Sequence, residues 1–373
     1  MKIISEFGGI SKLSLFADVY IGKKILLVTG KKSYLKSGAK KIVSDSLINE
    51  KVIQFSQFSV NPNLKDAISG ARIAYKHKTE VIIAIGGGSV IDMAKLIKAF
   101  CKNISEVEKI TIENRSFNDP NIPIIAIPTT AGSGSEATHF AVIYIDDRKF
   151  SVAHQCLLPQ CTILDGSLLI SASLYQRKCS ALDALAQAIE SAWAISSNIE
   201  SRKLAFKSMS VCWNVIKKFS SGKKDFEYQE MIKASNLAGQ SINITKTTAP
   251  HAFSYNITKH YNVPHGYAIW LTLPAILQIH FNACQKDILD PRGMVYFQEI
   301  MFKIIKILNL DIKYSLEEQL KKILEDMDVN LNFNDLGLNT VNKRKIICKN
   351  VNIERLSNNP VNLNDMLRYI FKY

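Results

Sequence analysis

The pattern of hydrophobic positions changes near residue 165. Before that point, short apolar runs rich in β-branched residues alternate with segments of helical length. The clearest runs are KILLVTGKK (24–32), VIIAIGGGS (81–89) and IPIIAIPTT (122–130). Fully apolar runs of this length are typical of parallel strands that are buried on both faces. We therefore predict an α/β domain over residues 1–165, with a parallel sheet and crossover helices such as residues 63–77.

After residue 165 the apolar positions recur with a helical period. The segments with this period include SLYQRKCSALDALAQAIESAW (173–193), ESRKLAFKSMSVCWNVIKKF (200–219), EEQLKKILEDM (317–327) and LNDMLRYIFKY (363–373). Strand-like runs of β-branched residues are scarce in this half. The pattern predicts an all-α second domain over residues 166–373.

Composition is that of a folded protein with two cores. The chain has 373 residues, of which 47% are hydrophobic and 21% charged, and this length suits two domains. No apolar run approaches the length of a membrane span, and residues 1–16 lack the features of a signal peptide. The seven cysteines show no paired spacing, as expected for reduced thiols. We expect a cytoplasmic protein that does not bind membranes.

The formal net charge of +14 raises three possibilities: nucleic-acid binding, an anionic substrate, or a basic surface. The lysines are spread from Lys2 to Lys372 and alternate with acids on the expected helices. No nucleic-acid-binding motif is present. We therefore expect solvated helix faces and no nucleic-acid partner.

Two glycine-rich segments follow predicted strands. GGGSVIDMAK (86–95) joins a strand to a helix, so its backbone N–H groups could hold a phosphate at the helix start. It is not a GxGxxG fingerprint, and a tight strand–helix turn is the alternative. TTAGSGSEAT (129–138) is rich in hydroxyls and could wrap a nucleotide, or it could be an ordinary surface loop.

Four polar residues of the second half could form a metal site. Asp183 and Gln187 are four residues apart and therefore share one helix face. His251 and His265 come from later segments and could complete a set of two oxygens and two imidazoles, which suits Fe²⁺, Zn²⁺, Mn²⁺ or Co²⁺. The alternative is one buried and one surface histidine without a metal.

The order of these blocks resembles the iron-containing alcohol dehydrogenase family. The resemblance rests on GGGSVIDMAK, PTTAGSGSEAT, LLPQCTILDGSLL, LDALAQAIES, HAFSY, VPHGYAIWLTLP and the terminal RLSNNP. It implies a dinucleotide-binding α/β domain followed by an all-helical metal domain, an architecture shared with dehydroquinate synthase. It also implies a nicotinamide cofactor and a divalent metal, with Fe²⁺ expected first and Zn²⁺ as an alternative.

The resemblance assigns roles to individual residues. The implied cofactor-binding residues are Gly87, Gly88, Ser89, Asp92, Lys95, Thr129, Thr130, Ser133 and Lys149. The implied metal ligands are Asp183, His251 and His265, with Gln187 where the family usually has a histidine. Gln187 is a neutral and weaker ligand than imidazole.

Two further departures point to a branch of the family. Tyr255 replaces a histidine thought to relay protons, and KTT (246–248) replaces a glycine-rich approach to His251. These segments resemble the phosphonoacetaldehyde reductase branch. Lys246 could hold an anionic head group, helped by the hydroxyls of Thr247, Thr248 and Ser254, although a surface lysine is the alternative. Arg202 is a weaker second candidate for that role, and Tyr255 is the expected proton donor.

The end of the first strand bears on the choice of cofactor. Many family members carry an acid there, which binds the ribose 2′-hydroxyl. This chain has Gly30, Lys31 and Lys32 instead. The missing acid and the two lysines favour a 2′-phosphate, so we expect NADPH rather than NADH.

The sequence thus predicts a metal-dependent NAD(P)H oxidoreductase that reduces a small anionic aldehyde, phosphonoacetaldehyde first, to a primary alcohol. Three alternatives remain: a generic alcohol dehydrogenase, a dehydroquinate-synthase-like lyase, and a non-catalytic basic binding protein. The apolar helices of the second domain would allow a homodimer.

Overall fold

The computed structural model describes residues 1–146, 148–220, 227–330, 332–349 and 351–371. The chain forms two compact units: unit 1 contains Met1–Ser173 and Glu227–Gly239, and unit 2 contains Leu174–Phe226 and Gln240–Tyr373. The sequence pattern predicted a single domain boundary between residues 165 and 166. In the structure, unit 1 extends to Ser173 and also includes the first part of helix α9 (Tyr228–Thr245).

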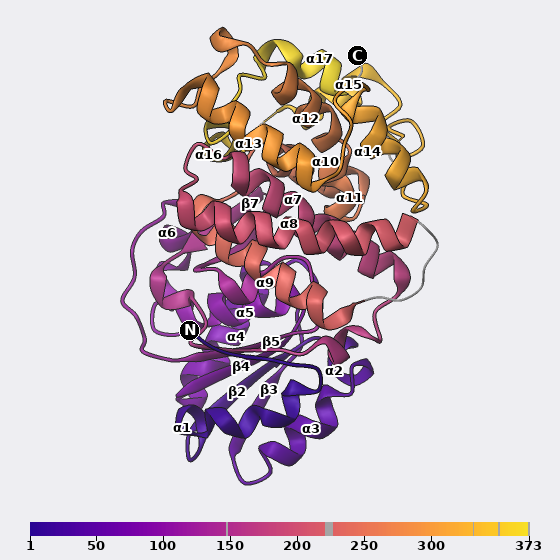
Figure 1. The fold of residues 1–373 in the computed structure, drawn as a ribbon. Coiled ribbons are helices and arrows are strands. Elements are labelled where there is room, and N and C mark those ends of the chain that lie inside the picture. The colour runs from indigo at the N-terminus through magenta and orange to yellow at the C-terminus, as the bar shows by residue number, and fades with distance from the viewer. Residues whose placement is uncertain (147, 221–226, 331, 350, 372–373) are drawn as a thin grey trace. The chain divides into compact units, whose positions relative to one another are not determined.

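Six parallel strands form the main sheet of unit 1, in the order β1-β8-β5-β4-β2-β3. Figure 1 labels β2, β3, β4 and β5 of this sheet. The strands are β1 (Lys2–Ser5), β2 (Lys24–Thr29), β3 (Lys51–Phe55), β4 (Val81–Gly86), β5 (Ile124–Pro128) and β8 (Cys161–Leu164). The three apolar runs of the sequence correspond to β2, β4 and β5, so the prediction of a parallel sheet is confirmed.

Both faces of this sheet are buried, because alternate residues of each strand enter different cores. On β2 and β4, Leu26 and Ile82 belong to one hydrophobic cluster, whereas Ile25 and Ile83 belong to the other. Helices α4, α5 and α6 contribute to the first cluster, and the N-terminal 3-10 segment with α1, α2 and α3 to the second. Side chains of neighbouring strand residues point to opposite faces, which explains why these strands have no polar face.

The helices of unit 1 are mostly short. They are α1 (Ala17–Tyr20), α2 (Ser33–Lys36), α3 (Ala39–Ser46), α4 (Leu64–His77), α5 (Gly88–Phe100) and α6 (Val107–Ile112), preceded by 3-10 turns at Gly9–Phe16. Strands β6 (Phe140–Ile145) and β7 (Arg148–Ala153) form a separate antiparallel pair. Asn63 caps α4 by accepting a hydrogen bond from the Asp66 N–H (2.8 Å), as its place before the helical run predicts.

The regular secondary structure of unit 2 is helical in its described residues, apart from one isolated β-bridge between Ile288 and Val361, and the unit contains the end of α9. Its other helices are α7 (Leu174–Trp193), α8 (Ile199–Ser220), α10 (Ala249–Tyr261), α11 (His265–Trp270), α12 (Leu273–Asn282), α13 (Gly293–Ile307), α14 (Leu316–Glu325), α15 (Val341–Ile347), α16 (Ile353–Ser357) and α17 (Leu367–Phe371). The all-α prediction is therefore confirmed. Within the described chain, no helix has both the length and the apolar character that crossing a membrane requires.

The strand order places a switch point between β2 and β4. The chain moves from β2 to β3 in one direction, and later adds β4 on the other side of β2 and β5 beyond it. Because all these strands are parallel, the turns after β2, β4 and β5 meet at one edge of the sheet. Ligands of open α/β sheets bind at the carboxyl ends of the strands beside such a switch point. The two glycine-rich turns of the sequence lie at this edge.

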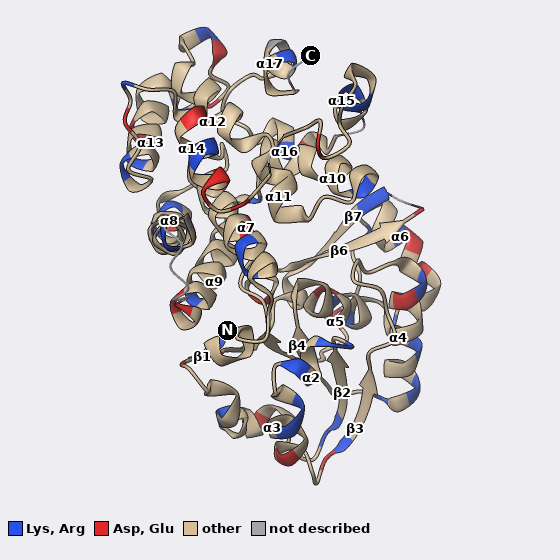
Figure 2. Ribbon diagram, turned by 90° about the vertical axis from the view of Figure 1, so that its right-hand side faces the viewer, with Lys and Arg blue, Asp and Glu red and all other residues tan. Residues whose placement is uncertain are grey.

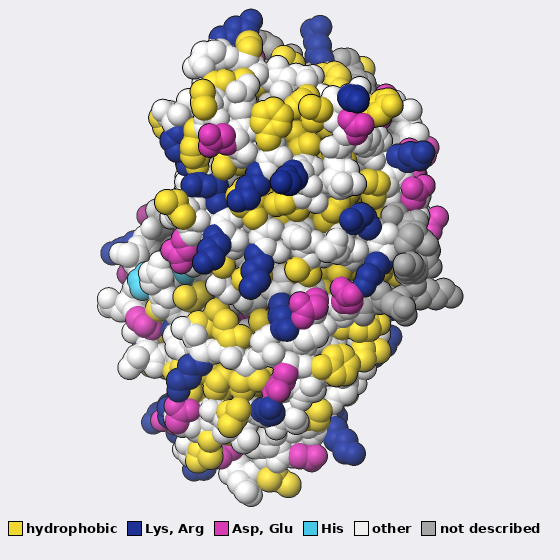
Figure 3. All heavy atoms as spheres, in the orientation of Figure 1, with side chains coloured by type: hydrophobic (Ala, Val, Ile, Leu, Met, Phe, Trp, Pro, Cys, Tyr) yellow, Lys and Arg dark blue, Asp and Glu magenta, His cyan; other side chains and the backbone are white. Residues whose placement is uncertain are grey.

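The basic residues are dispersed rather than concentrated. Figure 2 shows Lys and Arg on many helices of each unit, mixed with Asp and Glu. On the face drawn in Figure 3, blue and magenta side chains are likewise interspersed. This distribution agrees with solvated helix faces as the origin of the net positive charge.

Candidate metal and cofactor sites

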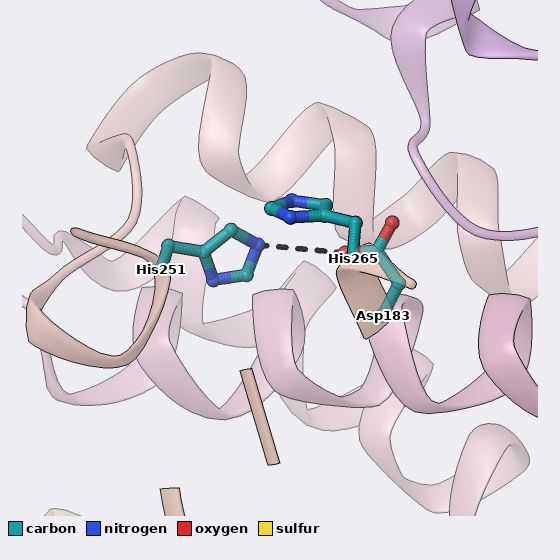
Figure 4. Close-up of side chains that lie close together, drawn as sticks. All are labelled: Asp183, His251 and His265. Carbon is teal, nitrogen blue, oxygen red and sulfur yellow. Dashed lines mark ion pairs between the residues drawn. The ribbon is translucent and has the colours of Figure 1, made fainter. Parts of the chain in front are cut away.

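Three helices of unit 2 bring Asp183, His251 and His265 together (Figure 4). Asp183 lies on α7, His251 in the first turn of α10, and His265 at the first residue of α11. One potential ligand atom from each side chain lies within 4.8 Å of the other two. The sequence prediction that these three residues meet is therefore reproduced by the fold.

The geometry and burial of the cluster suit a divalent cation. The Nε2 atom of His251 is buried, has no hydrogen-bond partner among the described residues, and lies 3.4 Å from Asp183 Oδ1. The rings of His251 and His265 meet at 78° with their centroids 5.4 Å apart. A carboxylate oxygen and two imidazole nitrogens that converge in a buried site match the ligands of Fe²⁺ or Zn²⁺.

The fourth expected ligand, Gln187, also lies in the cluster. It is 3% exposed, and its Nε2 donates a hydrogen bond to Asp183 Oδ1 at 3.2 Å. The spacing of four residues on α7 produces this contact. In the structure, Gln187 thus holds the carboxylate of Asp183 in place.

Glu190 is a site residue that the sequence analysis missed. It is fully buried on α7, and its Oε1 hydrogen-bonds with Nδ1 of His251. Its Oε2 accepts hydrogen bonds from the N–H and the hydroxyl of Thr248, at 2.7 and 3.0 Å. A carboxylate on Nδ1 fixes the tautomer and orientation of the ring, so that Nε2 is left for a metal. The signal was available, because Glu190 follows Asp183 by seven residues on the same helix face.

The electrostatics of the cluster follow from these contacts. Burial alone would lower the pKa of His251, but the charge of Glu190, the hydrogen bond to Glu190 and the nearby Asp183 carboxylate outweigh burial and raise it. Burial alone would raise the pKa of Asp183, but His251 and His265 outweigh it, so that this pKa is lowered. The negative charges of Asp183 and Glu190 thus favour a positive charge at the cluster, and a bound divalent cation would supply it.

Replacing Glu190 by glutamine is expected to weaken metal binding about 10- to 100-fold, because His251 loses its charged partner while the side-chain volume is kept. Competition with a metal-binding dye measures the dissociation constant. The matched control is Glu200→Gln, an exposed position on α8 that should leave the constant unchanged. An unchanged constant in Glu190→Gln would contradict the assigned role.

Tyr255 and Ser254 both contact the metal-site histidines. The ring of Tyr255 stacks on that of His265, with centroids 5.8 Å apart and an interplanar angle of 20°. Burial raises the pKa of Tyr255, which keeps its hydroxyl protonated. Ser254 is buried, donates to the His251 carbonyl (2.8 Å) and lies 3.4 Å from His265 Nδ1. Ser254 thus contacts the two histidines, whereas the sequence analysis considered its hydroxyl as a donor to the substrate.

Several expected substrate contacts are bound to protein partners. The side chain of Lys246 is 41% exposed and forms an ion pair with Glu354. The Thr248 hydroxyl is buried between Glu190 and Trp193. Arg202 contacts Tyr296 and Ser197 rather than a metal ligand. The binding of an anionic head group by Lys246 or Arg202 therefore stays a prediction.

In unit 1, the expected phosphate turn joins β4 to α5. Gly87 caps α5, and no side chain caps this helix end, so its backbone N–H groups lack a side-chain acceptor. A Cβ atom at Gly88 would lie 2.9 Å from Ser133 Cβ and overlap its hydroxyl, so glycine lets the 129–138 loop approach closely. Thr129 is buried, and its hydroxyl has no hydrogen-bond partner among the described residues. Ser89 and Thr130 are partly exposed at this edge.

Asp92 and Lys95 hold the 129–138 loop in place. Lys95 is fully buried, and its ammonium donates to the Ser135 carbonyl (2.6 Å), the Thr138 hydroxyl (3.0 Å) and the Phe140 carbonyl (2.9 Å). Asp92 accepts hydrogen bonds from the Ser135 hydroxyl and, at 3.1 Å, from the Val142 N–H. Burial lowers the pKa of Lys95 to about 8, although Asp92 and Glu136 oppose this shift. The structure thus shows both side chains supporting the loop.

The remaining cofactor candidates lie around the same edge. Gly30 follows β2, with its N–H donating to the Ile85 carbonyl at the end of β4 (3.3 Å), and Lys31 and Lys32 are exposed beside it. Lys149 lies on β7, near enough for its charge to lower the pKa of Asp92, although burial dominates and raises that pKa. These positions fit a nucleotide along the carboxyl ends of β2, β4 and β5.

Comparison with known proteins decides the family. Residues 1–166 match the model described as "Iron-containing alcohol dehydrogenase", and residues 178–368 match "Fe-containing alcohol dehydrogenase family, C-terminal". The chain belongs to the iron-containing alcohol dehydrogenase family. Both the metal cluster and the glycine-rich turns lie in the matched residues.

Individual relatives are named for different activities. A phosphonoacetaldehyde reductase of Streptomyces viridochromogenes is 28% identical over 64% of this chain and 63% of its own. A probable alcohol dehydrogenase EutG of Escherichia coli is 31% identical over 55% of this chain and 52% of its own. The chain thus spans less than two thirds of the length of these two relatives.

The fold comparison covers the whole chain. The crystal structure of sulfoacetaldehyde reductase from Bifidobacterium kashiwanohense in complex with NAD⁺ matches with a TM-score of 0.84 and 25% identity, covering 100% of this chain and 96% of that one. The predicted architecture, a parallel α/β domain followed by a helical domain, is therefore confirmed.

Proposed function

We propose that this protein reduces a small anionic aldehyde to a primary alcohol with NAD(P)H, and that the aldehyde is phosphonoacetaldehyde and the product 2-hydroxyethylphosphonate. The observation that carries the oxidoreductase assignment is the Asp183–His251–His265 cluster, in which Asp183 and His251 are buried and His265 is half-buried, in a chain of this family. Two of the similar proteins, a phosphonoacetaldehyde reductase and a sulfoacetaldehyde reductase, act by name on aldehydes that bear a tetrahedral oxyanion.

Asp183, His251 and His265 would hold the metal, with Gln187 and Glu190 as supports. When bound, a divalent cation supplies Lewis acidity toward the carbonyl oxygen, and the reduced nicotinamide supplies the hydride for the carbonyl carbon. The protein orients the site through the His251–Glu190 and Asp183–Gln187 hydrogen bonds. Asp183, Gln187, Glu190 and His251 are buried, which keeps bulk water away from this part of the site.

The reduced oxygen needs a proton, and Tyr255 is the group that we propose to donate it. Its ring lies against His265, and its hydroxyl hydrogen-bonds with Thr247. A hydroxyl in a hydrogen-bonded chain can pass a proton on and recover it from a neighbour. This role replaces the histidine relay that the family resemblance leads one to expect.

The turn between β4 and α5 would bind the cofactor pyrophosphate, since a helix start without a side-chain cap offers N–H groups and a favourable dipole to an anion. Lys31 and Lys32 follow β2, where they would meet a ribose 2′-phosphate. We therefore propose NADPH as the preferred cofactor.

Gly30→Asp is expected to shift the ratio of kcat/KM for NADPH to that for NADH toward NADH by about 10-fold or more, because a carboxylate binds the 2′-hydroxyl and repels a 2′-phosphate. The new Cβ overlaps the Ser33 hydroxyl, which must rotate away. Gly30→Ser controls for this crowding without adding charge. Steady-state kinetics with both cofactors gives the ratio, and an unchanged ratio in Gly30→Asp would contradict the proposed preference for NADPH.

Identification of the reaction product tests the proposed function. Phosphonoacetaldehyde and NADPH are incubated with metal-loaded protein, and ³¹P NMR follows the phosphorus species. We expect 2-hydroxyethylphosphonate to form in equal amount to the NADPH consumed. Chelator-treated protein should lose most of this activity and regain it with Fe²⁺ or Zn²⁺. Absence of the alcohol product from the metal-loaded reaction would refute the proposed function.

A generic alcohol dehydrogenase is the second candidate, because relatives such as EutG show a similar identity to this chain. Equal kcat/KM values for plain and anionic aldehydes would favour it. The lyase alternative has no such support, since both matching family models describe alcohol dehydrogenases.

A further inference from the structure

A cation to which the sequence analysis assigned no role of its own lies beside the metal cluster. Arg355, on the short helix α16, is half-buried, and its guanidinium carbon lies 5.7 Å from the centroid of the Tyr255 ring. The same ring stacks on His265, with centroids 5.8 Å apart. Tyr255 therefore contacts both the guanidinium and an expected metal ligand.

Hydrogen bonds fix Arg355 in this position. Its Nη1 donates to the hydroxyl of Thr247, a residue that is 2% exposed. Thr247 also hydrogen-bonds with Tyr255. The backbone of α16 is held as well, because the side chain of Asn352 accepts a hydrogen bond from the Arg355 N–H at 3.0 Å. Arg355, Thr247 and Tyr255 therefore form one polar network next to His265.

The charge of Arg355 is not neutralised by the protein. Among the described residues, no carboxylate forms an ion pair with it, whereas Lys178, Arg292 and Lys321 of unit 2 each have one. Its sequence neighbour Glu354 pairs with Lys246 instead, and both of those side chains are substantially exposed. Withdrawing a charged side chain from water costs free energy unless a group of opposite charge lies near it. The missing partner of Arg355 points to an anionic ligand.

We propose that Arg355, rather than Lys246, binds the oxyanion head group of the substrate, a phosphonate or sulfonate on a short aldehyde, while the aldehyde end lies at the Asp183–His251–His265 site. A guanidinium suits this role, because its planar fork donates two parallel hydrogen bonds to a tetrahedral oxyanion. Nη1 is already bound to Thr247, which orients the fork. The inference rests on the proposed function and assigns its substrate specificity to a residue.

The test compares Arg355→Met, which removes the charge, Arg355→Lys, which keeps it, and Lys246→Met, which removes the competing cation. Substrates are phosphonoacetaldehyde, sulfoacetaldehyde and butyraldehyde, a neutral aldehyde of similar size. Arg355→Met is expected to lower kcat/KM for the two anionic aldehydes about 100-fold, mainly through KM, and to change that for butyraldehyde by less than about 3-fold. Arg355→Lys should recover part of the loss.

Equilibrium binding gives a readout that does not depend on turnover. Titration calorimetry with methylphosphonate and with methanesulfonate, on metal-loaded protein containing NADP⁺, measures the dissociation constants of the head groups alone. Arg355→Met should weaken both, and Lys246→Met neither. The ratio of the two constants in the wild-type protein distinguishes a phosphonate site from a sulfonate site.

The outcomes separate this inference from the proposed function. If the wild-type protein prefers anionic aldehydes but Lys246→Met rather than Arg355→Met loses that preference, the inference is wrong and the proposed function stands. If Arg355→Met loses activity equally on all three substrates, Arg355 has only a structural role. If the wild-type protein shows no preference for an anionic aldehyde, the proposed substrate class itself fails.

Discussion

Replacing His251 by alanine is expected to lower kcat/KM for aldehyde reduction by about three orders of magnitude, because the Lewis acid loses an imidazole ligand and several kcal/mol of stabilisation of the developing oxyanion. The same change removes the partner of the buried Glu190 carboxylate. Metal analysis of the purified protein should show a substoichiometric metal content, and steady-state kinetics with saturating Fe²⁺ should recover only a small part of the activity.

The control for this variant is His260→Ala, which lies on the same helix, α10, but is exposed. It should retain both metal and activity. Circular dichroism verifies that each variant keeps its helices. If His251→Ala bound metal and reduced aldehydes like the wild-type protein, the assignment of the metal site would be wrong.

Replacing Lys95 by methionine is expected to destabilise unit 1 by about 3–5 kcal/mol, the usual effect of removing one partner from a buried charged network. The change removes the ammonium donor from the Ser135 and Phe140 carbonyls and leaves Asp92 and Glu136 without the nearby positive charge. Urea denaturation, followed by circular dichroism, measures the loss of stability. Since the 129–138 loop loses its anchor, the dissociation constant for NADPH should also rise, by about 10-fold or more.

Lys98→Met is the matched control for the second effect. Lys98 is also buried on α5, but its ammonium donates to the Cys156 carbonyl (2.6 Å) rather than to the 129–138 loop. This variant should lose stability and keep its affinity for NADPH. A Lys95→Met protein with wild-type stability and wild-type NADPH affinity would contradict the anchoring role.

Much of the fold follows from local sequence. The strands β2, β4 and β5 are apolar along nearly their whole length, because both faces of the sheet are covered, and this leaves a signal that needs no tertiary information. No local sequence pattern indicates that Glu227–Gly239 belongs to unit 1. Helix α9 runs from unit 1 into unit 2 with one continuous helical pattern, so its division depends on contacts that only the folded chain contains.

The site shows the same division between local and tertiary information. The side-by-side placement of Asp183 and Gln187 follows from helix periodicity, and Glu190 could have been added by the same reasoning. The place of Arg355 could not be predicted, since it and Tyr255 are brought together by the packing of α16 against α10. Lys95 illustrates a further limit. A lysine after a glycine-rich turn can face a phosphate or the protein interior, and only the fold shows that it is buried.

The most direct test of the account is the ratio of kcat/KM for phosphonoacetaldehyde to kcat/KM for butyraldehyde, measured with NADPH and the metal-loaded wild-type protein. If Arg355 binds the anionic head group of the substrate, which butyraldehyde lacks, this ratio should be about 100 or more. A ratio near one, with good activity on butyraldehyde, would contradict the proposed substrate class and leave a generic alcohol dehydrogenase.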